Sequence, residues 1–237
     1  MISTDLPVKG ARFLARGARS VARTPDIARA LAISERYRQY TMIDQQSYVE
    51  NLLLAHRWAP PGGEVVECGV WRGGMSRGLA DMLGPGRKYH LFDSFEGLPP
   101  AQELDGQEAI DWSAKQQDES SPEFFGNCSA EESFARKLFE GSGLDVEFHR
   151  GWFDDTLPKY QAERPITVAR LDGDWYDSTM TCLRALVPQL APKAVILVDD
   201  YYSWDGCARA IHDYLSETKS AMRIQQGRFG TCYLING

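Results

Sequence analysis

The chain has 237 residues, of which 43% are hydrophobic, 25% charged and 11% aromatic. This is ordinary globular composition, and the length corresponds to one domain or at most two. Collagen, coiled coils and mostly disordered chains are excluded, and no apolar run reaches the ~18 residues that a membrane-spanning helix needs. The net charge of -7 makes nucleic acid a poor partner, because phosphate binding relies on clustered cations.

Charge is unevenly distributed along the chain. Residues 1–40 hold eight Lys/Arg and three Asp/Glu, whereas the rest is acidic. We expect residues 1–40 to form a basic helical arm that acts as a lid or as a subunit contact, and residues 41–237 to form one domain. Lys9 and Arg12 interrupt the apolar core that a signal peptide requires. The five cysteines are odd in number and form no CxxC pair, which favours a reducing, cytoplasmic setting.

Strands and helices are predicted to alternate through most of the chain. Apolar runs predict strands at 64–68, 88–92, 145–149, 166–171 and 194–198. Apolar spacing and flanking glycines predict helices at 44–58, 75–83, 130–140, 178–186 and 206–215. Two closing strands, 222–225 and 230–235, leave no room for a helix between them and should pair antiparallel. The polar stretch 101–123, with seven Asp/Glu and one Lys, is expected to be a loop or insertion.

This alternation predicts an α/β fold with a doubly wound sheet, mostly parallel with an antiparallel last strand. In such sheets ligands bind beyond the carboxyl ends of the strands. Candidate functional residues are therefore those that follow each predicted strand.

The first predicted strand ends in Glu67 and runs into a turn that contains Gly69, Gly73 and Gly74. Glycines allow positive φ and a close backbone approach to a ligand. The spacing is not GxGxxG, and Glu67 would repel a pyrophosphate, so a cationic ligand such as S-adenosylmethionine is favoured over NAD. Asp93, at the end of the second strand, is placed to accept ribose hydroxyls. The alternative is a plain tight turn followed by a solvated carboxylate.

Four aspartates follow the fourth and fifth predicted strands, 166–171 and 194–198: Asp172, Asp174, Asp199 and Asp200. Crowded carboxylates are unfavourable without a cation, and oxygen-only ligands favour Mg²⁺, with Mn²⁺ or Ca²⁺ also open. The alternative is a set of helix N-cap residues.

The histidines form no sequence motif. We expect His56, His90 and His212 to be surface or core residues, and the role of His149, near a strand end, stays open.

Five segments occur in order, ECGVWRGG, LFDSFEGLPP, GWFDDTLP, ARLDGDWYDST and VILVDDY. Together, over residues 40–237, they resemble the macrocin O-methyltransferase family. Those enzymes methylate sugar hydroxyls on macrolide and aminocoumarin antibiotics, using S-adenosylmethionine and Mg²⁺. The resemblance implies a class I methyltransferase fold, a small glycoside or diol acceptor, and a homo-oligomer.

The resemblance also assigns roles to individual residues. The implied cofactor contacts are Glu67, Gly69, Gly73 and Gly74 at the methionine end, Asp93 and Ser94 at the ribose, Gly151 and Trp152 near the adenine, and Thr41 and Met42 over the cofactor. The implied metal ligands are Asp172, Asp199 and Asp200, and Asp174 is the implied general base. Mg²⁺ would bind acceptor hydroxyls and lower their pKa, which favours a vicinal diol.

Three alternatives remain open at this point. A metal-dependent DxD glycosyltransferase would also use Asp172 and Asp174, but it leaves Glu67 and the glycine turn unexplained. A DxD phosphatase has the same local pattern, with Lys193 as its nearest later lysine. A non-catalytic small-molecule-binding protein of the same fold would not explain why four carboxylates are present.

Overall fold

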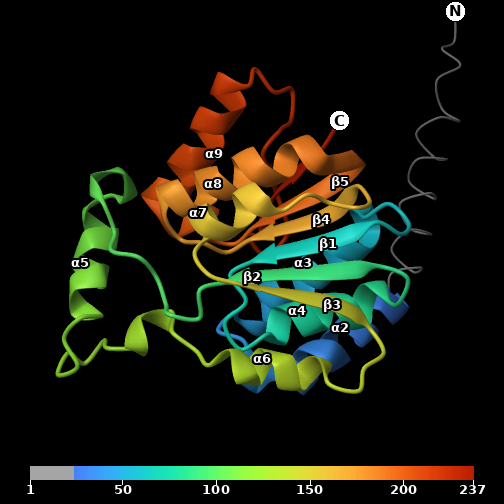
Figure 1. The fold of residues 1–237 in the computed structure, drawn as a ribbon, viewed down its shortest axis with the longest axis horizontal. Coiled ribbons are helices and arrows are strands. Elements are labelled where there is room, and N and C mark those ends of the chain that lie inside the picture. Colours follow the sequence, from blue (N-terminus) through green and yellow to red (C-terminus); the bar gives the residue numbers. More distant parts are fainter. Residues whose placement is uncertain (1–23) are drawn as a thin grey trace, which may run out of the picture.

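A seven-stranded sheet lies at the centre of the structure, a computed structural model that describes residues 24–237 (Figure 1). The strands are β1 (Glu64–Cys68), β2 (Lys88–Asp93), β3 (Asp145–Arg150), β4 (Ile166–Leu171), β5 (Leu190–Val198), β6 (Gln225–Gln226) and β7 (Cys232–Ile235). Their order is β3-β2-β1-β4-β5-β7-β6. Strands β1 to β5 run parallel, and β7 pairs antiparallel with β5 and β6. The predicted doubly wound fold with an antiparallel end is confirmed.

Helices cover both faces of this sheet (Figure 1). One face carries α2 (Thr24–Tyr37), α3 (Gln45–Trp58), α4 (Gly74–Leu83) and α6 (Glu132–Phe139). The other carries α7 (Phe153–Thr156), α8 (Tyr176–Leu186) and α9 (Asp205–Glu217). Short 3₁₀ turns are η1 (Arg38–Tyr40), η2 (Glu103–Asp105), η3 (Gly126–Cys128), η4 (Leu157–Lys159), η5 (Val187–Gln189) and η6 (Asp200–Tyr202).

The central strands β1 and β4 are buried at every position because helices cover both of their faces, and most of their side chains are apolar. In β1, Val65 packs into the core beneath α2, α3 and α4, and its neighbour Val66 packs into the core beneath α8 and α9. Successive strand side chains point to opposite faces, so a strand covered on both sides needs a continuous apolar run. This arrangement brings the polar residues that follow β1, β2, β4 and β5 to one edge of the sheet.

The expected basic arm, residues 1–40, is described only in its second half, since residues 1–23 lie outside the described residues. Helix α2 packs on α3 and α4, and its Ala30, Ile33 and Tyr37 belong to the same core. The Tyr37 hydroxyl donates a hydrogen bond to Asp81 on α4 at 2.7 Å. A lid or subunit role for residues 1–40 stays a prediction.

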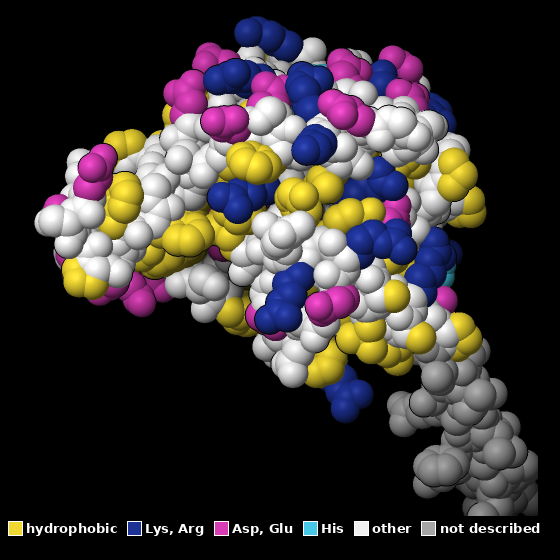
Figure 2. Space-filling model, turned by 90° about the horizontal axis from the view of Figure 1, so that it is seen from below, with side chains coloured by type: hydrophobic (Ala, Val, Ile, Leu, Met, Phe, Trp, Pro, Cys, Tyr) yellow, Lys and Arg dark blue, Asp and Glu magenta, His cyan; other side chains and the backbone are white. Residues whose placement is uncertain are grey.

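The expectation that 101–123 is a loop is wrong for its centre, which contains η2 and the helix α5 (Gln107–Lys115). Charges at the two ends of α5 suit a helix: Glu108 lies in its first turn and Lys115 in its last. Polar composition concealed a small buried face, at Ala109 and Ser113. In Figure 2 hydrophobic side chains gather on this projecting segment, at the left of the view. Three large exposed hydrophobic residues flank α5 in the sequence: Leu104, Phe124 and Phe125.

Among residues 24–237, none of the helices is both long and apolar enough to cross a bilayer. The five cysteines are all free thiols, as the sequence predicts.

Candidate active site

A cavity of about 470 Å³ opens at the carboxyl ends of the parallel strands. Most of the residues that the sequence singled out line it: Thr41, Met42, Gly69, Asp93, Ser94, Trp152, Asp172, Asp174, Asp199 and Asp200. Four predicted residues do not: Glu67, Gly73, Gly74 and Gly151. The structure therefore gathers residues separated by up to 159 positions around one space, as the rule for parallel sheets requires.

The turn after β1 is shaped by close contact with the residue that follows β4. Gly69 has a φ of 92°, and a Cβ on it would lie 1.9 Å from the carbonyl oxygen of Asp172. No other residue fits without moving one of the two strands' ends. Farther along, Gly73 has a φ of 82° and forms the N-cap of α4. These glycines set the path of the turn rather than all lining the cavity.

Asp93 fastens this turn to the end of β2. One of its oxygens accepts hydrogen bonds from the N–H groups of Val70 and Trp71 at 2.6 and 2.8 Å, and the other accepts from Phe95 at 2.6 Å. Burial raises the pKa of the Asp93 carboxyl, and these backbone donors oppose that rise. Trp71 has a φ of 48°, a conformation that L-residues rarely adopt. The carboxylate therefore holds a strained turn at the edge of the cavity.

Glu67 lies behind the turn and is fully buried. Its carboxylate accepts a hydrogen bond from the Ser76 hydroxyl and another from Arg170 Nη1, the latter at 2.8 Å. Burial raises the pKa of Glu67, while the Arg170 guanidinium favours its charged form. In this conformation the side chain faces a buried cation instead of the cavity.

Arg170, on β4, joins the two halves of the site and was missed by the sequence analysis. Its Nη1 contacts both Glu67 and Asp172 at 2.8 Å, and its Nη2 lies 2.8 Å from Asp199 Oδ1. The side chain is 1% exposed. A single arginine inside the apolar run ITVARL is the signal that would have revealed it, because a buried guanidinium needs carboxylate partners.

Three aspartates form a tight cluster at the cavity floor. Oxygens of Asp172, Asp174 and Asp200 lie within 4.8 Å of one another, a spacing that a cation can bridge. Burial and mutual repulsion raise the pKa values of Asp172 and Asp200 well above their usual range. The structure thus groups the residue expected to be the base with two of the three expected ligands, while Asp199 pairs with Arg170. The individual roles stay predictions.

Asp174 is held in one orientation. Its φ is 57°, its N–H donates to Asp200 Oδ2 at 3.0 Å, and its Oδ1 accepts from Trp204 Nε1 at 3.0 Å. Burial raises the pKa of Asp174 to about 7, against the opposing hydrogen bond from Trp204. Strained backbone that persists under such restraint is typical of catalytic positions. A carboxyl that titrates near neutral pH suits proton transfer.

Three tryptophans pack together beside Asp174, outside the cavity lining. Trp175 and Trp204 lie 5.2 Å apart between ring centroids, and Trp112 lies 6.0 Å from each. Trp112 belongs to α5, so the segment expected to be a loop or insertion supplies one of these three rings. The sequence analysis missed all three residues, because their proximity depends on tertiary packing.

Known proteins resemble this chain in both sequence and fold. A family model described as macrocin-O-methyltransferase (TylF) matches residues 19–227. The chain is 38% identical over 159 residues to 8-demethyl-8-(2,3-dimethoxy-alpha-L-rhamnosyl)-tetracenomycin-C 4'-O-methyltransferase of Streptomyces olivaceus, covering 64% of this chain and 58% of that one. It is 33% identical over 159 residues to mycinamicin III 3''-O-methyltransferase of Micromonospora griseorubida, covering 64% and 60%. The match thus spans about three fifths of these relatives.

Solved structures extend the likeness. The O-methyltransferase NovP aligns with a TM-score of 0.65 and 26% identity, covering 83% of this chain and 82% of that chain. The calicheamicin methyltransferase CalS11 aligns with a TM-score of 0.57 and 21% identity, covering 87% and 92%. The second likeness shows a shared fold.

Proposed function

The chain belongs to the macrocin-O-methyltransferase family, and from that membership we propose that it transfers a methyl group from S-adenosylmethionine to a hydroxyl of a glycoside. The observation that carries this proposal is the cluster of Asp172, Asp174 and Asp200 at the floor of a cavity bordered by the Asp93 turn. Relatives named for methylation at the 4' position of a rhamnosyl-tetracenomycin and the 3'' position of mycinamicin III favour a sugar hydroxyl. Family membership also favours methyl transfer over glycosyl transfer.

The cofactor's expected place is the β1 side of the cavity. S-adenosylmethionine, when bound, supplies an activated methyl on a positively charged sulfur. The turn between Gly69 and Gly73, fixed by Asp93, presents backbone close to this part of the cavity, and Thr41 and Met42 also line the cavity. A cavity with this many carboxylates suits a cationic ligand.

The acidic floor fits a divalent cation. The guanidinium of Arg170 ion-pairs with three carboxylates, those of Glu67, Asp172 and Asp199. The carboxylates of Asp174 and Asp200 lie beside that of Asp172 and add to the negative charge. The raised pKa values of Asp172 and Asp200 indicate surplus negative charge at this site, and carboxylate oxygens are the ligands that a hard divalent cation prefers. We assign Asp172, Asp199 and Asp200 to Mg²⁺, which when bound lowers the pKa of an acceptor hydroxyl.

Asp174 then accepts the proton of the acceptor hydroxyl. Trp204 holds one oxygen of its carboxylate and Asp200 holds its backbone N–H, so the second carboxylate oxygen is left for the acceptor. Phe153, which lines the cavity beside Gly173, offers a flat surface against which the apolar face of a sugar or the attached aglycone packs, excluding water from the reacting oxygen. Trp112 and the buried Trp175 pack around Trp204 outside this lining and support its contact with Asp174. Holding oxygen and methyl in line contributes a proximity effect of up to several kcal/mol.

The test measures methyl transfer from labelled S-adenosylmethionine to a panel of glycosides that carry vicinal diols, with Mg²⁺ present. We expect transfer to at least one acceptor. EDTA or Asp199→Ala should abolish it, while calorimetry still detects S-adenosylmethionine binding.

Asp118→Ala is the matched control, because Asp118 is a fully exposed carboxylate outside the cavity lining. It should leave transfer unchanged. Full transfer in EDTA would contradict the metal assignment, and absence of S-adenosylmethionine binding would contradict the proposed function itself.

A further inference from the structure

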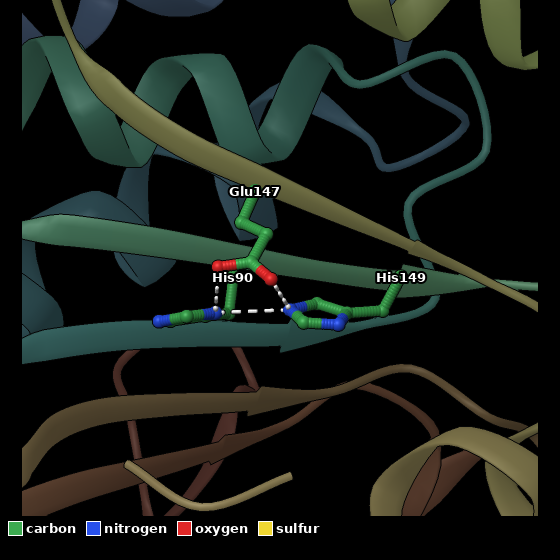
Figure 3. Close-up of side chains that lie close together, drawn as sticks. All are labelled: His90, Glu147 and His149. Carbon is green, nitrogen blue, oxygen red and sulfur yellow. Dashed lines mark hydrogen bonds and ion pairs between the residues drawn. The ribbon is translucent and has the colours of Figure 1, made fainter. Parts of the chain in front are cut away.

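A second group of metal-ligating side chains lies outside the proposed active site, on β2 and β3 (Figure 3). His90 Nδ1 is 2.9 Å from His149 Nε2 and 3.8 Å from Glu147 Oε2. Glu147 Oε1 is 3.8 Å from His149 Nε2. These side chains open into a cleft of about 790 Å³ that shares no lining residue with the active-site cavity.

Strand pairing explains why the three side chains meet. In the parallel pair β2–β3, His90 lies opposite Glu147, and Phe92 lies opposite His149. Residues two apart on a strand point to the same face, so Glu147 and His149 both lie on the His90 side of the sheet. The Phe92 ring stacks on His149 with centroids 4.1 Å apart, which fixes the imidazole plane. The grouping is therefore built into the sheet and does not depend on a loop.

We propose that His90, Glu147 and His149 bind a divalent first-row transition metal ion, for which Zn²⁺ is the best match. Zn²⁺ takes imidazole nitrogen and carboxylate oxygen at ~2.0–2.1 Å, and ligand atoms on a tetrahedral ion are then about 3.3 Å apart. The two nitrogens lie 2.9 Å apart, each lies 3.8 Å from one of the two Glu147 oxygens, and one ligand atom from each residue falls within 4.8 Å of the others. Two imidazoles distinguish this site from the all-oxygen cluster at the active site, which suits Mg²⁺.

A buried carboxylate supports His90 from behind. Glu64, on β1, is fully buried, and its Oε2 lies 3.2 Å from His90 Nε2. The same Glu64 accepts hydrogen bonds from the Tyr160 hydroxyl at 2.7 Å and from the N–H groups of Glu163 and Arg164. Metal-bound histidines commonly present their other nitrogen to such a carboxylate, which orients the ring and increases its basicity. Burial lowers the pKa of both His90 and His149, which keeps them in the neutral, ligating form.

Lys88 is the neighbouring charge that opposes a cation here. Its Nζ is 3.0 Å from Glu147 Oε2 and 3.1 Å from Glu163 Oε1. Because Lys88 has Glu163 as a second partner, it retains an ion pair when Glu147 turns to a metal. Removing the ammonium should therefore strengthen metal binding. The alternative explanation for the short His90–His149 contact is a proton shared between the two rings. If only a proton lies there, removing Lys88 should not change the affinity for added metal.

An ion at this point would fasten the edge of the sheet. β3 is the terminal strand and pairs on one side with β2. A metal held by one residue of β2 and two of β3 would join the strands independently of their backbone hydrogen bonds. Binding to the folded state alone would raise the melting temperature of the protein.

The experiment uses the full chain in excess Mg²⁺, and counts bound Zn²⁺ after removal of free metal, with calorimetry for affinity. His149→Gln is the main variant, because that side chain is 20% exposed, whereas that of His90 is buried. His56→Gln is the matched control, a more exposed histidine on α3. We expect wild type and His56→Gln to hold one Zn²⁺ per chain more than His149→Gln. Co²⁺ should show the visible absorption of a tetrahedral nitrogen- and oxygen-ligated ion in wild type and not in His149→Gln.

Two further variants test the surroundings. Lys88→Met should bind Zn²⁺ several-fold more tightly than wild type, and Glu64→Gln about ten-fold more weakly. Zn²⁺ should raise the melting temperature of wild type and of His56→Gln, but not of His149→Gln. Equal Zn²⁺ content in wild type and His149→Gln would overturn the proposal and leave the shared proton as the occupant. None of these readouts depends on methyl transfer, so their failure is separate from failure of the proposed function.

Discussion

Replacing Asp174 with asparagine should stabilise the metal-free protein by an amount that grows with pH. The pKa of Asp174 is raised by burial from its usual 3.8 to about 7. The folded state therefore binds this proton more tightly than the unfolded state does, and stability falls as pH rises between those values. At 1.36 kcal/mol per pH unit, ionising the buried carboxyl costs up to about 4 kcal/mol above pH 7. Asparagine keeps the oxygen that accepts from Trp204 and carries no charge.

The assay is urea denaturation of wild type and Asp174→Asn in EDTA at intervals from pH 4 to pH 8. The pair must be compared at each pH because His90 and His149, whose pKa values are lowered by burial, change stability in the opposite direction. We expect the free-energy difference in favour of Asp174→Asn to be small near pH 4 and to level off above pH 7. A constant difference across this range would refute the reasoning. The same variant should lack methyl transfer.

Three other changes test separate contacts. Arg170→Met leaves the buried carboxylate of Glu67 without its cation and should destabilise the protein by about 3–5 kcal/mol, measured by urea denaturation; a loss below 1 kcal/mol would contradict this. Trp204→Phe removes the N–H that holds the Asp174 carboxylate and should lower kcat of methyl transfer about ten-fold with little effect on the acceptor KM, and an unchanged kcat would refute its role. Asp93→Ala frees the N–H groups of Val70 and Trp71 in the turn after β1 and should weaken S-adenosylmethionine binding at least ten-fold by calorimetry; an unchanged Kd would exclude a role of this turn in cofactor binding.

The strands and the residues at their carboxyl ends were predictable because each depends on a short continuous stretch of sequence. A run such as 166–171 must be buried on both faces, and the polar residues after it must lie at one edge of the sheet. That reasoning placed Asp93, Asp172, Asp174 and Asp200 around one cavity before any geometry was known.

Lateral neighbours were not predictable in the same way. His90 and His149 are 59 residues apart and meet only through the register of β2 with β3, which no local pattern encodes. The helix α5 was missed because its polar composition resembles a loop, and its buried face depends on contacts made elsewhere in the chain. Arg170 was the exception, since a charge inside an apolar strand was visible in the sequence.

The surplus of negative charge at the strand ends has a functional meaning that stability alone does not explain. Arg170 ion-pairs with Glu67, Asp172 and Asp199, and so lessens the repulsion among them without removing it. A site evolved for stability alone would replace Asp174 with a neutral residue, since its ionisation costs up to about 4 kcal/mol. Active sites commonly retain such unfavourable groups where a ligand offsets them. A divalent ion and a sulfonium would supply the missing positive charge. The surplus carboxylates at the strand ends would therefore strengthen the binding of the two cationic ligands that the proposed reaction needs.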